Sequence, residues 1–299
     1  MNLTNPSLII YNTLTPTHVG SGTDLGYTDL PIQRETHTGI PKIESSTLKG
    51  CLRPVLTRQQ NESLINQLLG DPNKGDYAAA VSFTDARLLF FPVKSVIGIF
   101  AWITCPYVLE RFQKDCKNAG LDFTLLDNLL SEEIPNRITD SSQLATDNSC
   151  TKIMLEDYLF TVQKDADFTS FVKSFSSHLP MESGMQKRFV SHAVLLSDDD
   201  FTYFVKYATE VNTRIKINPQ TGTVDGTALF TEEFLPPESI LYSLIFYDDL
   251  HVAQESGSKS IDVRQSFLDS FNNFSTFQIG ADATLGKGLV CKTLWKEGQ

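Results

Sequence analysis

The chain has 299 residues, of which 41% are hydrophobic and 20% charged, so it carries enough apolar material to bury a large core. This composition excludes wholesale disorder and collagen-like structure. The net charge of −11 and the pI near 4.9 argue against a protein that holds nucleic acid through a broadly basic surface, although they leave room for a narrow basic track.

In the first third of the chain, hydrophobic runs alternate with clusters of glycine, proline and small polar residues. The expected elements are, in chain order, a buried strand at 7–14, an irregular loop at 18–35, a helix N-capped by Ser45 or Ser46 and perturbed at Pro54, a strand through 81–93, and a helix that starts near Pro106. The apolar stretch 88–109 resembles a membrane span, but Pro92, Lys94 and Pro106 would put a charge and broken backbone into lipid. We interpret it as a buried strand, a glycine-containing turn and a helix, with no membrane association.

The rest of the chain begins with a segment at 118–152 that is rich in Asn, Asp, Ser and Thr and lacks periodicity, and we expect a surface insertion there. The elements expected after it are a helix over 153–178, a helix capped by Asp198, Asp199 and Asp200, a long hairpin at 213–234, a buried strand at 239–247, a helix near 260–272, and a last strand interrupted by Gly280, Gly286 and Gly288. Strands and helices interleave without an internal repeat. The sequence therefore predicts an α+β fold with one continuous core, as a single domain over 1–299.

Several common kinds of site are missing from the sequence. It contains no GxxxxGK[ST], HExxH or GxSxG motif, and its five histidines and five cysteines lack the spacing of zinc ligands. Nucleotide hydrolysis, zinc hydrolysis and serine-esterase chemistry are therefore disfavoured. The scattered cysteines indicate reduced thiols and the first residues lack the regions of a secretion signal, so a cytoplasmic protein is expected.

The loop at 18–35 gathers His18, Asp24, Asp29 and other charged residues around flexible glycines. Loops held by a strand often carry function. A carboxylate in such a loop can bind a hard metal ion or take a proton from a hydroxyl group. The alternative, which the local sequence favours, is that the aspartates are ordinary turn residues bonded to their own backbone.

A second feature is the start of the helix that follows. Ser45 and Ser46 leave backbone N–H groups available, and the helix dipole favours an anion there. Lys49 and Arg53 lie four residues apart on one face beside that position. The arrangement suits a phosphate backbone, and a capped helix with two solvated cations explains it equally well.

A third, weaker feature is the glycine-rich segment at 279–289. Gly286 and Gly288 would let the chain approach a ligand closely, and Lys287 adds a positive charge. The segment is not a dinucleotide-binding fingerprint, because no helix obviously follows it.

Together these features resemble a known family, the backbone subunits of type III-B (Cmr) CRISPR–Cas effector complexes, which belong to the RAMP superfamily. The segments that carry the resemblance lie in family order over nearly the whole chain, at 18–35, 39–50, 85–106, 199–201, 232–236 and 280–288. Their agreement is much more specific than any single motif.

The resemblance implies a fold and a set of roles. Such subunits have an RRM-like, ferredoxin-like palm with insertions and a protruding β-hairpin thumb, here 213–234, and further copies line up along one CRISPR RNA with other Cmr effector subunits. Each thumb displaces a base pair of the guide–target duplex, and the target RNA is cut beside it. By the motif match, Asp29 takes the position of the catalytic aspartate, and His18 and Glu232 match positions near the scissile phosphate. Phe234 occupies an aromatic position that is often Tyr in relatives, and it has no hydroxyl group to transfer a proton.

The chemistry that the resemblance implies is physically reasonable. An A-form duplex keeps the ribose 2′-OH out of line with the bond to be broken, whereas a splayed nucleotide allows alignment. The protein then needs a wedge and a carboxylate that either assists the hydroxyl or holds Mg²⁺ or another divalent cation such as Mn²⁺, and both roles remain open for Asp29. The implied RNA-binding residues are Ser45, Ser46, Lys49, Arg53, Arg214, Lys216, Gly286, Lys287 and Gly288.

Two functions of different classes follow from these observations. The main hypothesis is a metal-dependent RNA endonuclease, active within the assembled complex, that binds CRISPR RNA and cleaves target RNA. The alternative is a non-catalytic structural subunit that only coats the guide RNA. An aspartate in an intact loop favours the first. A stand-alone guide-processing ribonuclease is disfavoured, because no histidine pair suited to acid–base cleavage is evident.

Overall fold

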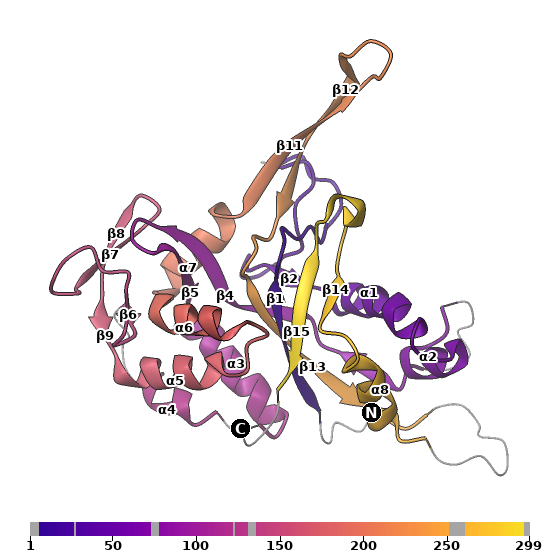
Figure 1. Cartoon of the computed structure of the whole chain (residues 1–299), viewed down its shortest axis with the longest axis horizontal. Helices are drawn as coiled ribbons and strands as arrows, with labels where there is room; N and C mark the ends of the chain where they lie inside the picture. Colours follow the sequence, from indigo (N-terminus) through magenta and orange to yellow (C-terminus); the bar gives the residue numbers. More distant parts are fainter. Residues whose placement is uncertain are drawn as a thin grey trace.

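The computed structural model describes residues 6–26, 28–72, 78–121, 123–130, 136–250 and 261–295. Figure 1 shows a large sheet with helices on both sides and a two-stranded hairpin that projects away from it. The strands are β1 Ser7–Thr13, β2 Lys42–Ile43, β3 Val81–Phe83, β4 Ala86–Ser95, β5 Ile99–Thr104, β6 Arg137–Ile138, β7 Lys152–Leu155, β8 Tyr158–Thr161, β9 Gln163–Lys164, β10 Ala193–Leu195, β11 Glu210–Ile217, β12 Val224–Phe234, β13 Ile240–Tyr247, β14 Thr276–Gln278 and β15 Leu289–Leu294. The helices are α1 Ser45–Thr57, α2 Glu62–Leu69, α3 Pro106–Asn118, α4 Leu125–Leu129, α5 Ala166–Ser176, α6 Ser183–His192, α7 Asp198–Tyr207, α8 Val263–Phe271 and the 3₁₀ turn η1 Ala283–Leu285.

The centre of the sheet is built from the most apolar runs of the sequence. The strand order along the main path is β14-β15-β1-β13-β4-β5-β10-β6-β9, and the pairs are antiparallel except β5–β10 and β6–β9. In β1 and β13 both faces are buried, which explains why these strands have continuous hydrophobic stretches and little alternation. The expected strands at 7–14 and 239–247 are confirmed.

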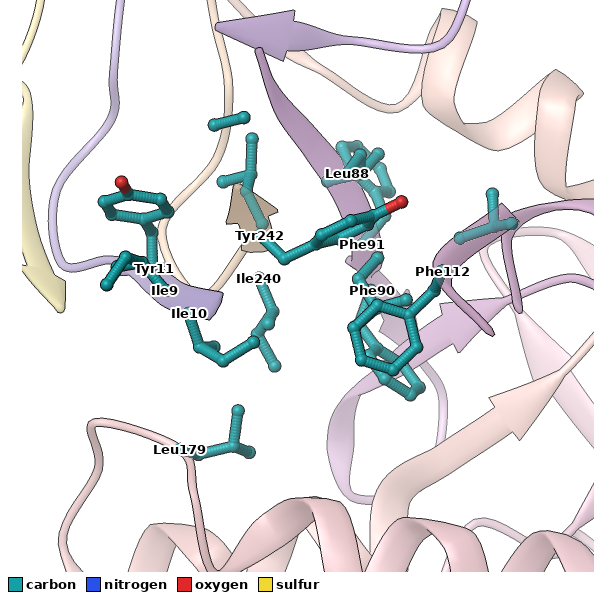
Figure 2. Close-up of a cluster of buried hydrophobic side chains, with 14 of the residues drawn as sticks. Ile9, Ile10, Tyr11, Leu88, Phe90, Phe91, Phe112, Leu179, Ile240 and Tyr242 are labelled. Atoms are coloured by element: carbon teal, nitrogen blue, oxygen red, sulfur yellow. The ribbon is translucent and has the colours of Figure 1, made fainter. Parts of the chain in front are cut away.

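The core on the α3 side of the sheet is rich in aromatic rings. Figure 2 shows Tyr242 of β13 and Phe90 of β4 close to Phe112 of α3, with side chains of β1 nearby. The rings of Phe112 and Tyr242 meet edge to face at 4.9 Å between centroids, which suits the ring quadrupoles. The α+β class with a large mixed sheet and a separate hairpin is therefore established.

The helices begin largely where the sequence indicates. Pro106 occupies the first turn of α3, as expected for a residue whose missing N–H costs nothing there. The N-cap of α7 is Ser197, whose side chain accepts a hydrogen bond from the Asp200 amide, so the three aspartates lie in the first turn and do not cap it. The expectation that Ser45 or Ser46 caps α1 was wrong, because Glu44 is the N-cap residue and makes no side-chain cap bond.

Two further expectations differ from the structure. The region 153–178 is not one helix: β7, β8 and β9 come first, and α5 starts only after Asp165, which caps it. The physical reason is the alternating burial of β7, in which Ile153 and Leu155 point inward. The strand β5 was also missed, between the turn at Gly98 and α3.

The polar segment at 118–152 contributes more to the core than a surface insertion would. Leu126 and Leu129 of α4, Ile138 of β6, and Leu144 are fully buried. In sequence these apolar residues are diluted by Asn, Asp, Ser and Thr, so they show no period. The part at 131–135 lies outside the described residues.

The hairpin formed by β11 and β12 is a separate two-stranded sheet. Its strands pair antiparallel with Thr213 opposite Thr231, and the register shifts between Ile215 and Ile217. It pairs with no other strand in the described part of the chain, and several of its apolar side chains, among them Ile215, Ile217 and Leu229, are exposed. No helix among the described residues is long and apolar enough to cross a membrane.

Candidate active site

Three segments far apart in the sequence meet at the base of the hairpin: the 18–35 loop, the β12 end of the hairpin, and the 280–288 loop. Backbone hydrogen bonds join them, from Leu30 N to Thr231 O at 3.0 Å, from Leu235 N to Thr17 O at 2.9 Å, and from Ala281 N to His18 O at 2.9 Å. The first and third features of the sequence therefore belong to one site.

The carboxylate of Asp29 is held at this site by Thr231. Its Oδ2 accepts hydrogen bonds from the amide of Thr231 at 2.7 Å and from the hydroxyl of Thr231 at 2.8 Å. These bonds, the backbone one first, hold the pKa of the Asp29 carboxyl below its usual range. Asp29 is exposed, so the site presents a fixed, ionised carboxylate to solvent.

His18 and Glu232 form a buried pair. The Nδ1 of His18 donates to the carbonyl oxygen of Glu233 at 2.6 Å, since a carbonyl can only accept. The Nε2 of His18 lies 3.6 Å from Oε1 of Glu232. His18 is thereby oriented with its Nε2 towards the carboxyl group of Glu232.

Arg214 closes the other side of Glu232. Its Nε lies 2.9 Å from Oε2 of Glu232, and its Nη1 donates to Oδ1 of Asp282 at 3.0 Å. The Glu232 side chain is only 4% exposed, and burial, partly offset by His18 and Arg214, raises the pKa of its carboxyl. Arg214 is therefore engaged with two carboxylates, and the structure does not present it as a free RNA contact.

The two halves of the site lie on opposite faces of β12. Successive side chains of a strand alternate, so Thr231 and Glu233 face one way and Glu232 and Phe234 the other. Asp29 binds the Thr231 face, whereas His18 and Arg214 contact the Glu232 face. The structure thus brings the three candidate catalytic residues to one strand end without placing them in one cluster.

Phe234 is buried on the same face of β12 as Glu232. Its ring packs edge to face on the ring of His18, with 5.7 Å between centroids. The Nζ of Lys287 lies 4.8 Å above the same ring and 4.0 Å from Oε1 of Glu210. Here Phe234 is an apolar platform that holds a histidine and a lysine in place.

The two glycines beside Lys287 have different structural roles. Gly288 has a φ of +74°, and a Cβ there would lie 2.0 Å from the carbonyl oxygen of Ile279, so only glycine fits. Gly286 also has a positive φ, of +72°, but it faces open space. The close approach at Gly288 is therefore a contact with the Ile279 backbone of the same chain, whereas Gly286 leaves open space for a ligand.

The start of α1 already holds an anion from the protein. Oδ1 of Asp85 accepts a hydrogen bond from the Ser45 amide at 2.9 Å, and Oδ2 of Asp85 binds Lys42 at 2.8 Å. Ser46 is exposed beside this pair. The anion site that the sequence predicts at Ser45 is therefore occupied by a side chain.

Lys49 and Arg53 differ, although they share a helix face. Arg53 donates to Oδ1 of Asn66 and to the carbonyl oxygens of Leu69 and Gly70, which ties α1 to the end of α2. Lys49 has no ion pair among the described residues, and burial and then Arg53 lower the pKa of its ammonium group. Only Lys49 remains available to a phosphate.

Three residues that matter for this geometry were given no role from the sequence: Thr231, Glu233 and Asp282. Glu233 is buried and binds Arg34 at 2.5 Å and the amide of Ile32 at 3.0 Å, which anchors the 18–35 loop. Two adjacent acids in a strand must face opposite ways, and that alternation was the available signal. The side chain of Lys216 lies outside the described part of the structure.

The described residues contain no group of three or more metal-ligating side chains. Asp29 still suits one mode of magnesium binding, because it is ionised and its Oδ1 accepts no hydrogen bond from a described residue. Mg²⁺ is often held by one or two carboxylates, with water and phosphate oxygens as the other ligands. The donor set fits an ion shared with RNA.

Known proteins resemble this chain over most of its sequence. The sequence profile of the RAMP superfamily matches residues 10–291. A Pyrococcus furiosus protein named CRISPR system Cmr endoribonuclease Cmr4 is 37% identical over 290 residues, which cover 94% of this chain and 93% of the relative. A Saccharolobus solfataricus protein named CRISPR system CMR subunit Cmr4 is 27% identical over 300 residues, 93% of this chain and 92% of the relative.

Solved structures agree in fold. A crystal structure of oligomeric Cmr4 from Pyrococcus furiosus superposes with a TM-score of 0.74 at 28% identity, covering 99% of this chain and 100% of that one. A chain of the type III-B Cmr-beta complex bound to cognate target RNA, at 19% identity, has a TM-score of 0.77 over 97% of this chain and 96% of that one, and so shows the fold alone. The chain belongs to the RAMP superfamily and, within it, to the Cmr4 family.

Proposed function

We propose that this protein is a backbone subunit of a type III-B CRISPR effector complex, and that it binds the guide RNA and cleaves complementary target RNA at regular intervals. The observation that carries the proposal is Asp29, an ionised and exposed carboxylate fixed by Thr231 at the base of a projecting hairpin. The relative at 37% identity, which is named an endoribonuclease, supports it.

The assembly is part of the proposal. The related Cmr4 of known structure is oligomeric, and a similar chain occurs in a Cmr-beta complex with target RNA. By analogy, further copies of this chain and other Cmr subunits are its partners, in a cytoplasmic complex. In this assembly the sheet around β1, β13 and β4 is the ferredoxin-like palm, and the β11–β12 hairpin is the thumb.

The reaction uses the RNA itself as the nucleophile. The thumb inserts between stacked bases and splays one nucleotide, which allows its 2′-OH to come into line with the phosphorus and the leaving 5′-oxygen. Asp29, ionised at neutral pH, accepts the hydrogen bond or the proton of that hydroxyl. His18 and Glu232 lie behind the strand, where their contact and the bond from His18 to the Glu233 carbonyl oxygen hold the base of the hairpin in place.

A divalent ion fits the same carboxylate. Mg²⁺ or Mn²⁺ would be held by Asp29, and it would supply positive charge to the phosphate as negative charge develops. The guide track uses Ser46 and Lys49 at the start of α1, together with Lys287 near the hairpin base. Each copy needs to contact only a few phosphates, because repeated copies along one guide RNA supply the avidity.

The test is Asp29→Ala in the assembled complex, with labelled complementary RNA and a denaturing gel. General-base or charge assistance is worth about 10²- to 10⁴-fold in rate, so we expect cleavage to fall by that factor while guide and target binding stay unchanged. Asp24→Ala is the matched control, since Asp24 has an exposed carboxylate in the same loop, and among the described residues that carboxylate accepts a hydrogen bond from the adjacent Leu25 amide alone. Rescue of the residual rate by Mn²⁺ would favour a metal ligand over a base. Wild-type cutting by Asp29→Ala would leave the chain as a non-catalytic subunit that coats the guide.

A further inference from the structure

A second polar pocket lies on the helical side of the molecule. It has a volume of about 560 Å³ and is formed by α5, α6 and the loop before Leu144, with Ser141, Gln143, Lys173, Gly184, Lys187 and Arg188 in its wall. Figure 1 shows α5 and α6 at the opposite end of the molecule from the hairpin tip. The pocket is therefore separate from the Asp29 site.

The charge of this pocket is unusual for an acidic protein. Lys173, Lys187 and Arg188 line it, no carboxylate lines it, and none of the three has an ion pair among the described residues. Elsewhere among the described residues, arginines commonly form ion pairs with carboxylates. The pairs are Arg34–Glu233, Arg87–Asp115, Arg111–Glu35, Arg137–Asp165 and Arg214–Asp282. Three unpaired cations around one hollow produce a locally positive potential in a chain of net charge −11.

The pocket also offers hydrogen-bond donors. Gly184 lies in the first turn of α6, whose N-cap residue Glu182 makes no side-chain cap bond, so free N–H groups and the positive end of the helix dipole are near the wall. At the other end of α6, His192 also belongs to the lining, but its side chain is buried and its Nε2 lies against Gly98, which is outside the wall of the pocket. Ser141 adds a hydroxyl. The wall of the pocket therefore combines three cationic side chains with hydroxyl and backbone N–H donors.

We propose that this pocket binds phosphate groups of single-stranded RNA, as a second contact on the helical side of the subunit. Lysine and arginine pair with phosphates, and hydroxyl and helix N–H groups suit phosphate oxygens and ribose 2′-OH groups. Among the described residues Val190 is the one hydrophobic residue in the lining, and no Phe, Tyr or Trp ring is present there on which a base could stack, so the pocket holds backbone and does not read bases. The proposal rests on the RNA-binding function proposed above.

The experiment uses the full-length chain and a labelled 20-nucleotide oligouridine, titrated at several salt concentrations. The variant is Lys187→Ala with Arg188→Ala, and the matched control is Lys152→Ala with Lys164→Ala, which removes two exposed lysines outside the pocket. Each phosphate contact on a single strand contributes about 0.7 to the slope of log K against log salt. We expect the pocket variant to lower that slope by about 1.4, and the control to leave it unchanged.

A second measurement locates the RNA. Oligouridine containing 4-thiouridine should crosslink to an α6 peptide in wild type and control, and much less in the pocket variant. Equal slopes for both variants, or crosslinks confined to the hairpin and α1, would overturn the proposal. So would an oligoglutamate peptide that binds the pocket more tightly than RNA of equal charge, because the partner would then be an acidic protein. Failure of the nuclease proposal shows differently, as cleavage that persists in Asp29→Ala while the α6 crosslink remains.

Discussion

Replacement of Arg214 by methionine tests whether the buried carboxylate of Glu232 depends on this ion pair. Methionine keeps much of the length and apolar packing of the arginine side chain but removes its charge. In the wild type, the Nε of Arg214 lies 2.9 Å from Oε2 of Glu232, and that oxygen has no other partner among the described residues. In the variant, the nearest basic side chain to Glu232 among the described residues is His18, whose Nε2 lies 3.6 Å from Oε1.

The expected loss in the free energy of unfolding follows from the burial of Arg214 and Glu232. Loss of one member of a buried pair typically costs about 3–5 kcal/mol, because the other charge stays without compensation. Since the Arg214 side chain is 25% exposed, we expect a smaller loss in the free energy of unfolding, about 2–3 kcal/mol at pH 8.

The loss should depend on pH in a defined direction. Burial raises the pKa of Glu232 in the folded state above its unfolded value, so Glu232 opposes folding as the pH rises through the interval between the two values. Removing Arg214 raises the folded pKa further and widens that interval. At pH 5 the variant can protonate Glu232, so the loss should fall to about 1 kcal/mol, which reflects the broken pair with Asp282.

The assay is urea unfolding at pH 5 and pH 8, followed by tryptophan fluorescence and linear extrapolation. The control is the double variant Arg214→Met with Glu232→Gln, in which residue 232 carries no charge and only Asp282 has lost its partner, so the loss at pH 8 should shrink to about 1 kcal/mol. Equal losses at both pH values, together with no rescue by Glu232→Gln, would refute the argument.

Three further predictions concern the glycine loop, α1 and the hairpin. Gly280→Ala should lower the free energy of unfolding by about 2–4 kcal/mol, because φ is +84° and the new Cβ would lie 2.0 Å from a backbone oxygen. Gly286→Ala, at a φ of +72° in open space, should lower it by only about 1 kcal/mol in the same denaturation assay. Lys49→Ala should weaken guide RNA binding in a filter assay and change the free energy of unfolding by less than about 0.5 kcal/mol. Arg53→Ala should leave the RNA affinity unchanged but lower the free energy of unfolding by about 1.5–3 kcal/mol, because the Arg53 guanidinium binds the end of α2. Shortening 216–224 to a tight turn should preserve folding but abolish regularly spaced cuts on a denaturing gel, and a surviving ladder of products would show that this hairpin is not the wedge.

The sequence by itself determined the elements whose signal is local. The apolar runs of β1 and β13, the proline that opens α3, and the Pro-Gln-Thr-Gly turn between β11 and β12 act within a few residues, so they could be interpreted without the fold. The motif match also led to Asp29, His18 and Glu232 at the base of one hairpin. Where the local pattern was mixed, as over 153–178, the prediction was wrong, because three short strands and a helix follow one another without a long period.

Only the tertiary structure decided what each polar side chain does. Lys49 and Arg53 look equivalent four residues apart on a helix, yet Arg53 is held by carbonyl oxygens at the end of α2, which lie 16 and 17 residues further along the chain. Arg214 resembles a thumb contact until Asp282, 68 residues away, is seen to bind it. A cation is free or engaged according to the groups that the fold brings within about 3 Å, and a linear sequence does not contain that distance.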